Sequence, residues 1–141
     1  MNKNGEIIII EDDEDDQEML EEVFNKLNHP NKRVYFIDGE AALEYLRKPN
    51  SHPFIILSDI NLPKLDGLKL KEKLQTDAEL SLKCIPYLFF STAVNQQVVI
   101  DAYSNSAQGF FIKATSIEEL TDSITIIMNY WKKCAAPNNF K

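Results

Sequence analysis

The chain has 141 residues, with 15 lysine and arginine side chains against 22 aspartate and glutamate side chains, so its formal net charge at pH 7 is −7. This length fits one domain, and 44% hydrophobic with 26% charged residues excludes a disordered or collagen-like chain. The negative charge disfavours nucleic-acid and anionic-membrane partners. No apolar stretch approaches the roughly 20 residues of a membrane span. Cys84 and Cys134 are too few for a disulfide framework, so we expect free thiols and a cytoplasmic location.

Five short runs predict strands. Residues 7–10, 54–57 and 87–90 are apolar at every position, which is typical of strands buried on both faces of a parallel sheet. Residues 33–37 and 110–112 are more mixed, so we expect them nearer the edges of the sheet.

Apolar residues at helical spacing follow each of these runs. Asp38-Gly39 and Asp66-Gly67 open the second and third helical patterns, and Ser116 with Glu119 forms a predicted capping box for the fifth. The predicted helices cover residues 15–27, 41–46, 68–80, 98–103 and 117–131.

Strand and helix therefore alternate five times. This order predicts an α/β fold with a doubly wound, five-stranded parallel sheet joined by right-handed crossovers. We place the domain at residues 5–133 and expect residues 134–141 to form a loose C-terminal tail. In such a sheet the ligand site lies at the carboxyl ends of the strands.

Side chains with useful chemistry follow four of the predicted strands. Glu11 and Asp12 follow the first, Asp59 the third, Ser91 the fourth and Lys113 the fifth. Clustered carboxylates raise each other's pKa unless a cation neutralises them, and Mg²⁺ suits carboxylate oxygens while leaving room for phosphate. A hydroxyl and a lysine could hold phosphoryl oxygens. The combination predicts a site that places a phosphoryl group on Asp59.

Simpler interpretations exist for each residue alone. An acidic run is usually a solvated helix start, and we interpret residues 13–16 in this way. The run lacks the glycine that an EF-hand calcium loop requires. A single Asp, Ser or Lys after a strand is usually a cap, a turn or a surface residue, so only the combination at four strand ends favours a phosphoryl site.

The sequence resembles the receiver domains of two-component response regulators over roughly residues 5–133. The matching stretches are Ile-Ile-Ile-Ile-Glu-Asp-Asp, Leu-Ser-Asp-Ile-Asn-Leu-Pro-Lys-Leu-Asp-Gly, Ile-Pro-Tyr-Leu-Phe-Phe-Ser-Thr-Ala and Gly-Phe-Phe-Ile-Lys. Within the family it is most similar to stand-alone receivers that open Glu-Asp-Asp-x-Asp-Asp. The resemblance implies a (βα)5 flavodoxin-like receiver fold.

The resemblance also implies roles for the acidic residues. Asp59 would be the phosphoacceptor. Glu11 and Asp12 match the family's acidic pair, with Asp12 as a direct metal ligand. Together with Asp59 and the backbone carbonyl of Asn61 they would hold Mg²⁺.

Three further roles follow from the resemblance. Ser91 matches the switch hydroxyl, Phe110 the aromatic switch position and Lys113 the phosphate-binding lysine. Ala114 stands where the family usually has a proline joined by a cis peptide bond. Because a cis bond costs about 2.5–4 kcal/mol without proline, against about 0.5–1 kcal/mol with it, we expect the Lys113–Ala114 bond to be trans.

The implied function is that of a single-domain response regulator. A sensor histidine kinase or phosphotransfer protein would supply the phosphoryl group, and the signal would pass to an unknown downstream protein by direct contact, since no folded output domain fits after residue 133. The domain would catalyse its own phosphorylation and slow dephosphorylation. The alternative is a degenerate receiver that binds partners without phosphorylation.

Two other enzyme or cofactor classes fit less well. A phosphatase of the haloacid-dehalogenase type needs a second aspartate two residues after the nucleophile, where this chain has Asn61. An FMN-binding module needs a hydroxyl- and glycine-rich phosphate loop after the first strand, where this chain is acidic.

Overall fold

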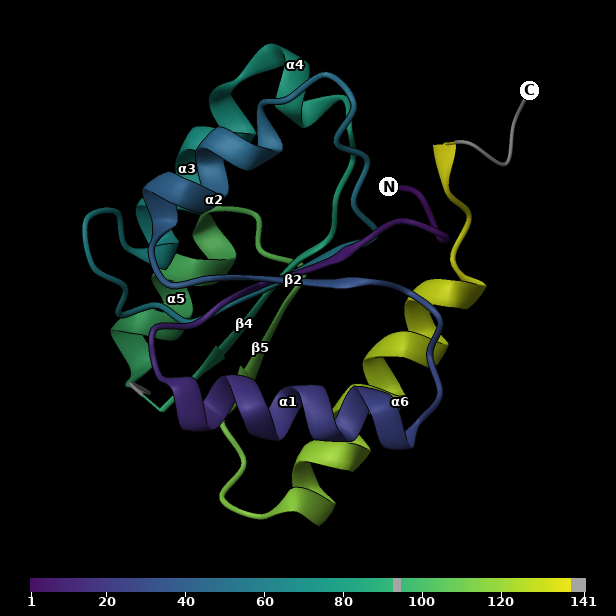
Figure 1. Ribbon diagram of the computed structural model, residues 1–141. Helices are drawn as coiled ribbons and strands as arrows, with labels where there is room; N and C mark the ends of the chain where they lie inside the picture. The colour runs from purple at the N-terminus through teal and green to yellow at the C-terminus, as the bar shows by residue number, and fades with distance from the viewer. Residues whose placement is uncertain (93–94, 138–141) are drawn as a thin grey trace.

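The structure is a computed structural model that describes residues 1–92 and 95–137. Within these residues there are five strands and six helices, and each strand is followed by one helix except β3, which is followed by α3 and α4 (Figure 1). The strands are β1 (Ile7–Ile10), β2 (Arg33–Phe36), β3 (Ile55–Ser58), β4 (Tyr87–Ser91) and β5 (Gly109–Ile112). The helices are α1 (Glu14–Lys26), α2 (Gly39–Leu46), α3 (Gly67–Thr76), α4 (Ala78–Ser81), α5 (Gln96–Ser104) and α6 (Ile117–Lys133).

The strands form one sheet in the order β2-β1-β3-β4-β5, and all four neighbouring pairs are parallel. This confirms the predicted doubly wound parallel sheet, with the two mixed strands at its edges. The observed strand bounds lie within about a residue of the predicted ones, which is the usual uncertainty of element ends.

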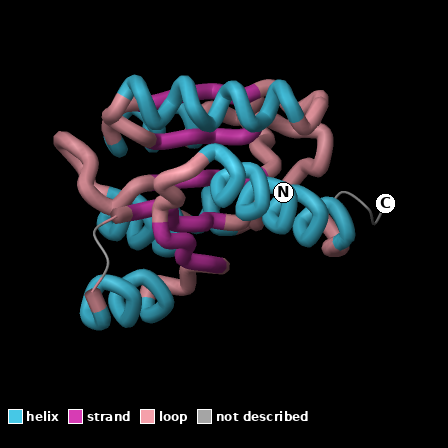
Figure 2. The backbone as a smooth tube through the Cα atoms, turned by 90° about the horizontal axis from the view of Figure 1, so that it is seen from below, coloured by secondary structure: helices cyan, strands magenta, loops and turns pink. Residues whose placement is uncertain are grey.

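Helices cover both faces of the sheet (Figures 1 and 2). Side chains alternate along a strand, so Ile8 and Ile10 point to one face and Ile7 and Ile9 to the other. The first pair packs in a core under α2, α3 and α5, and the second pair in a core under α1 and α6. All four isoleucines are at most 1% exposed, which explains why β1 is apolar at every position.

Side-chain caps begin the helices where the sequence predicts them. Asp38 accepts a hydrogen bond from the N–H of Ala41, and Asp66 from that of Lys69, each at 2.8 Å. Ser116 accepts from the N–H of Glu119 at 3.2 Å. These bonds satisfy backbone donors that the first turn of a helix leaves without a partner.

The predicted third helix is two helices. Asp77 has an extended backbone (φ −85°, ψ 119°) that ends α3, and its side chain caps α4 by accepting from Glu79 and Leu80. Leu80 therefore packs in the core from the short helix α4 rather than from an extended α3.

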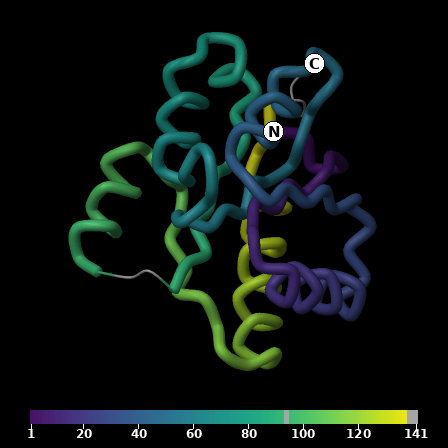
Figure 3. The backbone as a smooth tube through the Cα atoms, turned by 60° about the vertical axis from the view of Figure 1, so that its left-hand side comes forward, coloured from purple at the N-terminus to yellow at the C-terminus, as the bar shows by residue number. Residues whose placement is uncertain are grey.

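The two ends of the described chain lie near each other at the end of the sheet opposite the carboxyl ends of the strands (Figure 3). Ala136 is 1% exposed, so the expectation of a loose tail is wrong for this residue; residues 138–141 lie outside the described part. Cys84 and Cys134 are free thiols. Among the described residues, no helix has both the length and the apolar character to span a membrane.

Candidate functional site

The strand register brings the ends of β1 and β3 together. Ile10 pairs with Ser58 across the sheet, and the N–H of Asp59 donates to the carbonyl of Ile10 at 3.0 Å. Glu11 and Asp59, the next residues on each strand, therefore lie beside each other at the carboxyl edge of the sheet.

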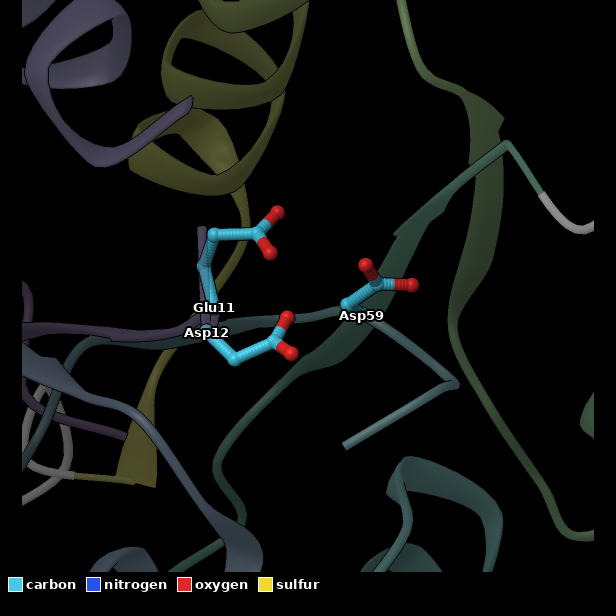
Figure 4. A group of neighbouring side chains, drawn as sticks. All are labelled: Glu11, Asp12 and Asp59. Carbon is cyan, nitrogen blue, oxygen red and sulfur yellow. The ribbon is translucent and has the colours of Figure 1, made fainter. Parts of the chain in front are cut away.

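Three carboxylates meet at this edge (Figure 4). Glu11, Asp12 and Asp59 each bring one carboxylate oxygen to within 4.8 Å of the others. Glu11 is buried, Asp59 is half-buried and Asp12 is exposed. Asp12 makes no side-chain hydrogen bond or ion pair with any described residue, so its carboxylate is accessible. Three hard oxygen donors with one side open to solvent are a donor set that fits Mg²⁺.

The side chain of Lys113 crosses from the end of β5 to carboxylates on three other segments. Its Nζ forms ion pairs with Glu11, with Asp16 at 2.8 Å and with Asp59 at 3.1 Å. The backbone N–H of Lys113 donates to the carbonyl of Ser91 at 3.0 Å, which anchors the start of this side chain to β4. The side chains of Lys113, Glu11 and Asp59 are at most 15% exposed, so solvent screens their ion pairs weakly, whereas Asp16 is 33% exposed.

The negative charge of the carboxylates at this site exceeds the single positive charge of Lys113. Burial raises the pKa of Glu11 to about 7, and the nearby Asp59 adds to this rise, while the hydrogen bond and charge of Lys113 oppose it. Burial alone would lower the pKa of Lys113, but its hydrogen bonds to Asp16 and Glu11 hold that pKa above its ordinary value. The site therefore holds more negative charge than Lys113 offsets, and a second cation would favour the ionised form of Glu11.

Asp59 is held at a fixed position by its neighbours. Its Oδ1 accepts the N–H of Ile60 at 2.7 Å, and the Ser58 hydroxyl donates to its backbone carbonyl at 2.7 Å. Gly67 begins α3 directly against it: a Cβ at Gly67 would lie 2.2 Å from the Asp59 carbonyl oxygen. Only glycine permits this approach of two backbones.

Comparison with known proteins identifies the family of this chain. A family model described as the response regulator receiver domain matches residues 7–125. The chain belongs to this family.

Individual relatives extend over most of the receiver domain. The probable methanogenesis regulatory protein FilR2 of Methanothrix harundinacea (strain 6Ac) is 30% identical over 129 residues, which cover 89% of this chain and 82% of the relative. The structure of the phosphorylated cyanobacterial phytochrome response regulator RcpA is 28% identical, with a TM-score of 0.84 over 94% of this chain and 97% of that one. The structure of the Mn²⁺-bound response regulator Rcp1 is 27% identical, with a TM-score of 0.81 over 93% and 97%.

Of the remaining predicted residues, Ser91 and Asn61 lie at or just after the carboxyl ends of their strands, and Phe110 lies within β5. Ser91 ends β4 and is 1% exposed. Phe110 is half-buried on β5, with its ring centroid 5.9 Å from that of Phe89. Asn61 is exposed, two residues after Asp59. The Lys113–Ala114 bond is trans, as predicted, since the described residues contain no cis peptide bond.

The interpretation of residues 13–16 as a solvated helix start is incomplete. Asp13 does cap α1, accepting from the N–H of Asp15 at 2.8 Å. Asp16, however, turns toward the sheet and pairs with Lys113. The sequence holds a signal for this, because Asp16 lies one turn before the buried Leu20 and so shares the inward face of α1.

Gln17 is a second residue that the sequence analysis missed. Its side-chain amide donates to the backbone carbonyl of Glu11 at 2.6 Å and so ties the helix to the acidic segment. A glutamine in an acidic run gives no sequence signal for such a contact.

Proposed function

We propose that this receiver domain takes a phosphoryl group onto Asp59 in a Mg²⁺-dependent reaction. The observation that carries the proposal is the joint placement of Asp59, two further carboxylates and the ammonium of Lys113 at one edge of the sheet. Phosphoryl transfer requires mainly positioning of the nucleophile and stabilisation of negative charge, and this arrangement can provide both.

The reacting group is the carboxylate of Asp59. One of its oxygens forms a bond to phosphorus while the phosphorus–nitrogen bond of a donor phosphohistidine breaks. The Ile60 N–H and the Lys113 ammonium hold this carboxylate in place, so its attack needs little rearrangement. Lys113, already within 3.1 Å of Asp59, then pairs with an oxygen of the arriving group.

The metal would be held by Glu11, Asp12 and Asp59, with the backbone carbonyl of Asn61 as a further oxygen donor. When bound, Mg²⁺ supplies positive charge beside the phosphoryl oxygens. The fit rests on the cluster of three carboxylates, whose negative charge exceeds the single charge of Lys113.

Movements of Ser91 and Phe110 would change the surface of the domain when the phosphoryl group is present. The Ser91 side chain is buried at the end of β4, next in the sheet to the strand that carries Lys113. We propose that its hydroxyl moves toward the phosphoryl group and that Phe110 packs into the space it leaves. Such a local charge event can bias a two-state element of the fold.

The donor in this proposal is a sensor histidine kinase or a phosphotransfer protein in the cytoplasm, and the output is contact with a downstream protein. A net charge of −7 disfavours nucleic acid and anionic membranes as direct partners. The alternative of a degenerate receiver depended on Ala114, and its support is weak because Lys113 reaches Asp59 with Ala114 in place.

The test is phosphorylation by a small donor, followed by intact mass. With phosphoramidate and Mg²⁺ we expect a gain of one phosphoryl group, which chelation of the metal and the substitution Asp59→Asn each abolish. Asp15→Asn, an exposed aspartate in the first turn of α1, is the matched control and should label normally. Full labelling of Asp59→Asn would assign the phosphoryl group to another residue and overturn the proposal.

A further inference from the structure

Lys71 is a charged residue on the buried face of α3. The buried residues of this helix are Gly67, Leu70, Lys71 and Leu74, and Lys71 is only 8% exposed. This helical spacing marks the stripe that packs on the core, where apolar side chains are expected.

The ammonium of Lys71 has no anionic partner. Among the described residues it forms no ion pair and no hydrogen bond, and its Nζ lies 6.0 Å from the centroid of the Tyr87 ring. Burial lowers the pKa of Lys71, and no neighbouring acid counters this. The Lys71 ammonium is not among the fully buried unpaired atoms of the described residues, so an anion can reach its three hydrogen-bond donors, none of which pairs with a described acceptor.

A pocket of about 140 Å³ opens at this side chain, between α3, α4, the start of β4 and Gln108, the residue before β5. Leu74, Leu80 and Tyr87 form apolar walls, and no aspartate or glutamate is among its described lining residues. The pocket therefore offers an apolar surface beside a positive charge that the protein itself does not neutralise.

Gln108 provides a second donor at the same pocket. Its side-chain oxygen accepts the N–H of Tyr87 at 2.8 Å, which fixes the amide and leaves its NH₂ group for other acceptors. An ammonium and an amide NH₂ can together hold the two oxygens of a carboxylate.

We propose that this pocket binds a small organic monocarboxylate, whose carboxylate pairs with Lys71 and Gln108 and whose apolar body packs on Leu74, Leu80 and Tyr87. A flat body the size of a benzene ring suits the volume. Inorganic phosphate suits the pocket less well, because the apolar walls would desolvate its second charge without a partner.

The pocket is separate from the phosphoryl site. It shares no lining residue with the pocket at Asp59 and Lys113, and it lies where β4 begins, whereas Ser91 ends that strand. Binding at Lys71 therefore does not depend on the proposed phosphoryl chemistry, and the two proposals can fail separately.

Benzoate and benzamide, which have the same shape and differ in charge, provide the test. We expect titration of the full chain, followed by NMR of the Gln108 side-chain amide and the Tyr87 backbone amide, to show benzoate binding at least about tenfold more tightly than benzamide. Equal affinities, or no shift of these two amides with benzoate, would overturn the proposal. Inorganic phosphate that bound as tightly as benzoate would contradict the assigned apolar body.

Lys71→Met keeps the length and the apolar packing of the side chain but removes its charge. In this variant the preference for benzoate over benzamide should disappear, whereas Lys69→Met, an exposed lysine of the same helix, should keep it. Retained benzoate preference in Lys71→Met would place the anion elsewhere. The comparison of the two ligands on the unaltered chain decides the question even if a variant folds poorly.

Discussion

Lys113 and Lys83 lie at opposite ends of this sheet, and the ammonium of each contacts three oxygen partners. Lys113, at the carboxyl ends of the strands, pairs with the carboxylates of Glu11, Asp16 and Asp59. Lys83, at the other end, donates from Nζ to the backbone carbonyls of Leu46, Lys48 and Ser51 at 2.7, 3.0 and 2.8 Å.

The partners of Lys83 are neutral carbonyls and those of Lys113 are carboxylates. This difference separates a contact that only stabilises the fold from one that can take part in function. Carbonyls at the end of α2 satisfy the Lys83 ammonium through local dipoles, so this contact requires nothing more to be stable. The carboxylates around Lys113 exceed its single charge, so they remain able to exchange partners with a metal ion or a phosphoryl group. We expect the Lys83 contact to act on stability alone and the Lys113 contact to respond to ligands.

Substituting each lysine by methionine tests this comparison most strongly. Lys113→Met should slow phosphorylation by phosphoramidate at least about 100-fold, because a donor to the developing charge is lost. It should also lower the free energy of unfolding by about 3 kcal/mol without metal, because the buried carboxylates lose their cation. Added Mg²⁺ should restore part of that stability. Mass spectrometry and urea unfolding with and without Mg²⁺ measure both effects.

Lys83→Met is the matched control. It should lose about 1–3 kcal/mol of stability through its carbonyl hydrogen bonds, equally with and without Mg²⁺, and phosphorylate at the normal rate. If Mg²⁺ rescued Lys83→Met as well as Lys113→Met, the distinction between the two ends would be wrong.

Metal binding should stabilise the unaltered domain and not a variant without Asp12. At a Mg²⁺ concentration 100 times the dissociation constant, binding to the folded state alone adds about 2.7 kcal/mol to the free energy of unfolding. Asp12→Ala should lose most of this gain, because its accessible carboxylate faces the other two. Asp15→Ala, on the solvent side of α1, should keep it. Equal losses in the two variants would show diffuse binding along the acidic run.

The raised pKa of Glu11 predicts a pH effect on stability in the absence of metal. Because the pKa of Glu11 is about 7 in the folded protein and ordinarily 4.5, the folded state binds the proton more tightly, and stability falls as the pH rises across that window. Between pH 5 and pH 8 in EDTA, we expect the unaltered chain to lose about 1–2 kcal/mol more than Glu11→Gln. Glu14→Gln, exposed in the same segment, should follow the unaltered chain. A Glu11→Gln curve parallel to the unaltered one would contradict the assignment.

The sequence predicts the sheet and the residues at its carboxyl edge because each depends on local pattern. Apolar runs identify strands, and a parallel sheet brings the strand ends together, so Glu11 and Asp59 can be placed without a structure. The break at Asp77 is not visible, because Leu74 and Leu80 fit one helical pattern until a side chain caps a new turn. The contact between Gly67 and the Asp59 backbone depends on three-dimensional packing, which no spacing rule contains.

The smallest predicted effect concerns Asp16, the partner of Lys113 that the sequence analysis treated as solvated. Its side chain is 33% exposed, so its ion pair at 2.8 Å is worth about 1 kcal/mol or less. In the proposed transfer, Lys113 leaves the Asp16 carboxylate to bind a phosphoryl oxygen, and the negative charge of Asp16 also repels an anionic donor. Asp16→Asn should therefore accept phosphoryl groups from phosphoramidate about two- to fivefold faster, with Asp15→Asn unchanged, in a time course followed by intact mass. Slower labelling of Asp16→Asn would mean instead that Asp16 positions Lys113 for transfer. The extra carboxylates at this end of the sheet would then orient Lys113 rather than compete with the phosphoryl group for it.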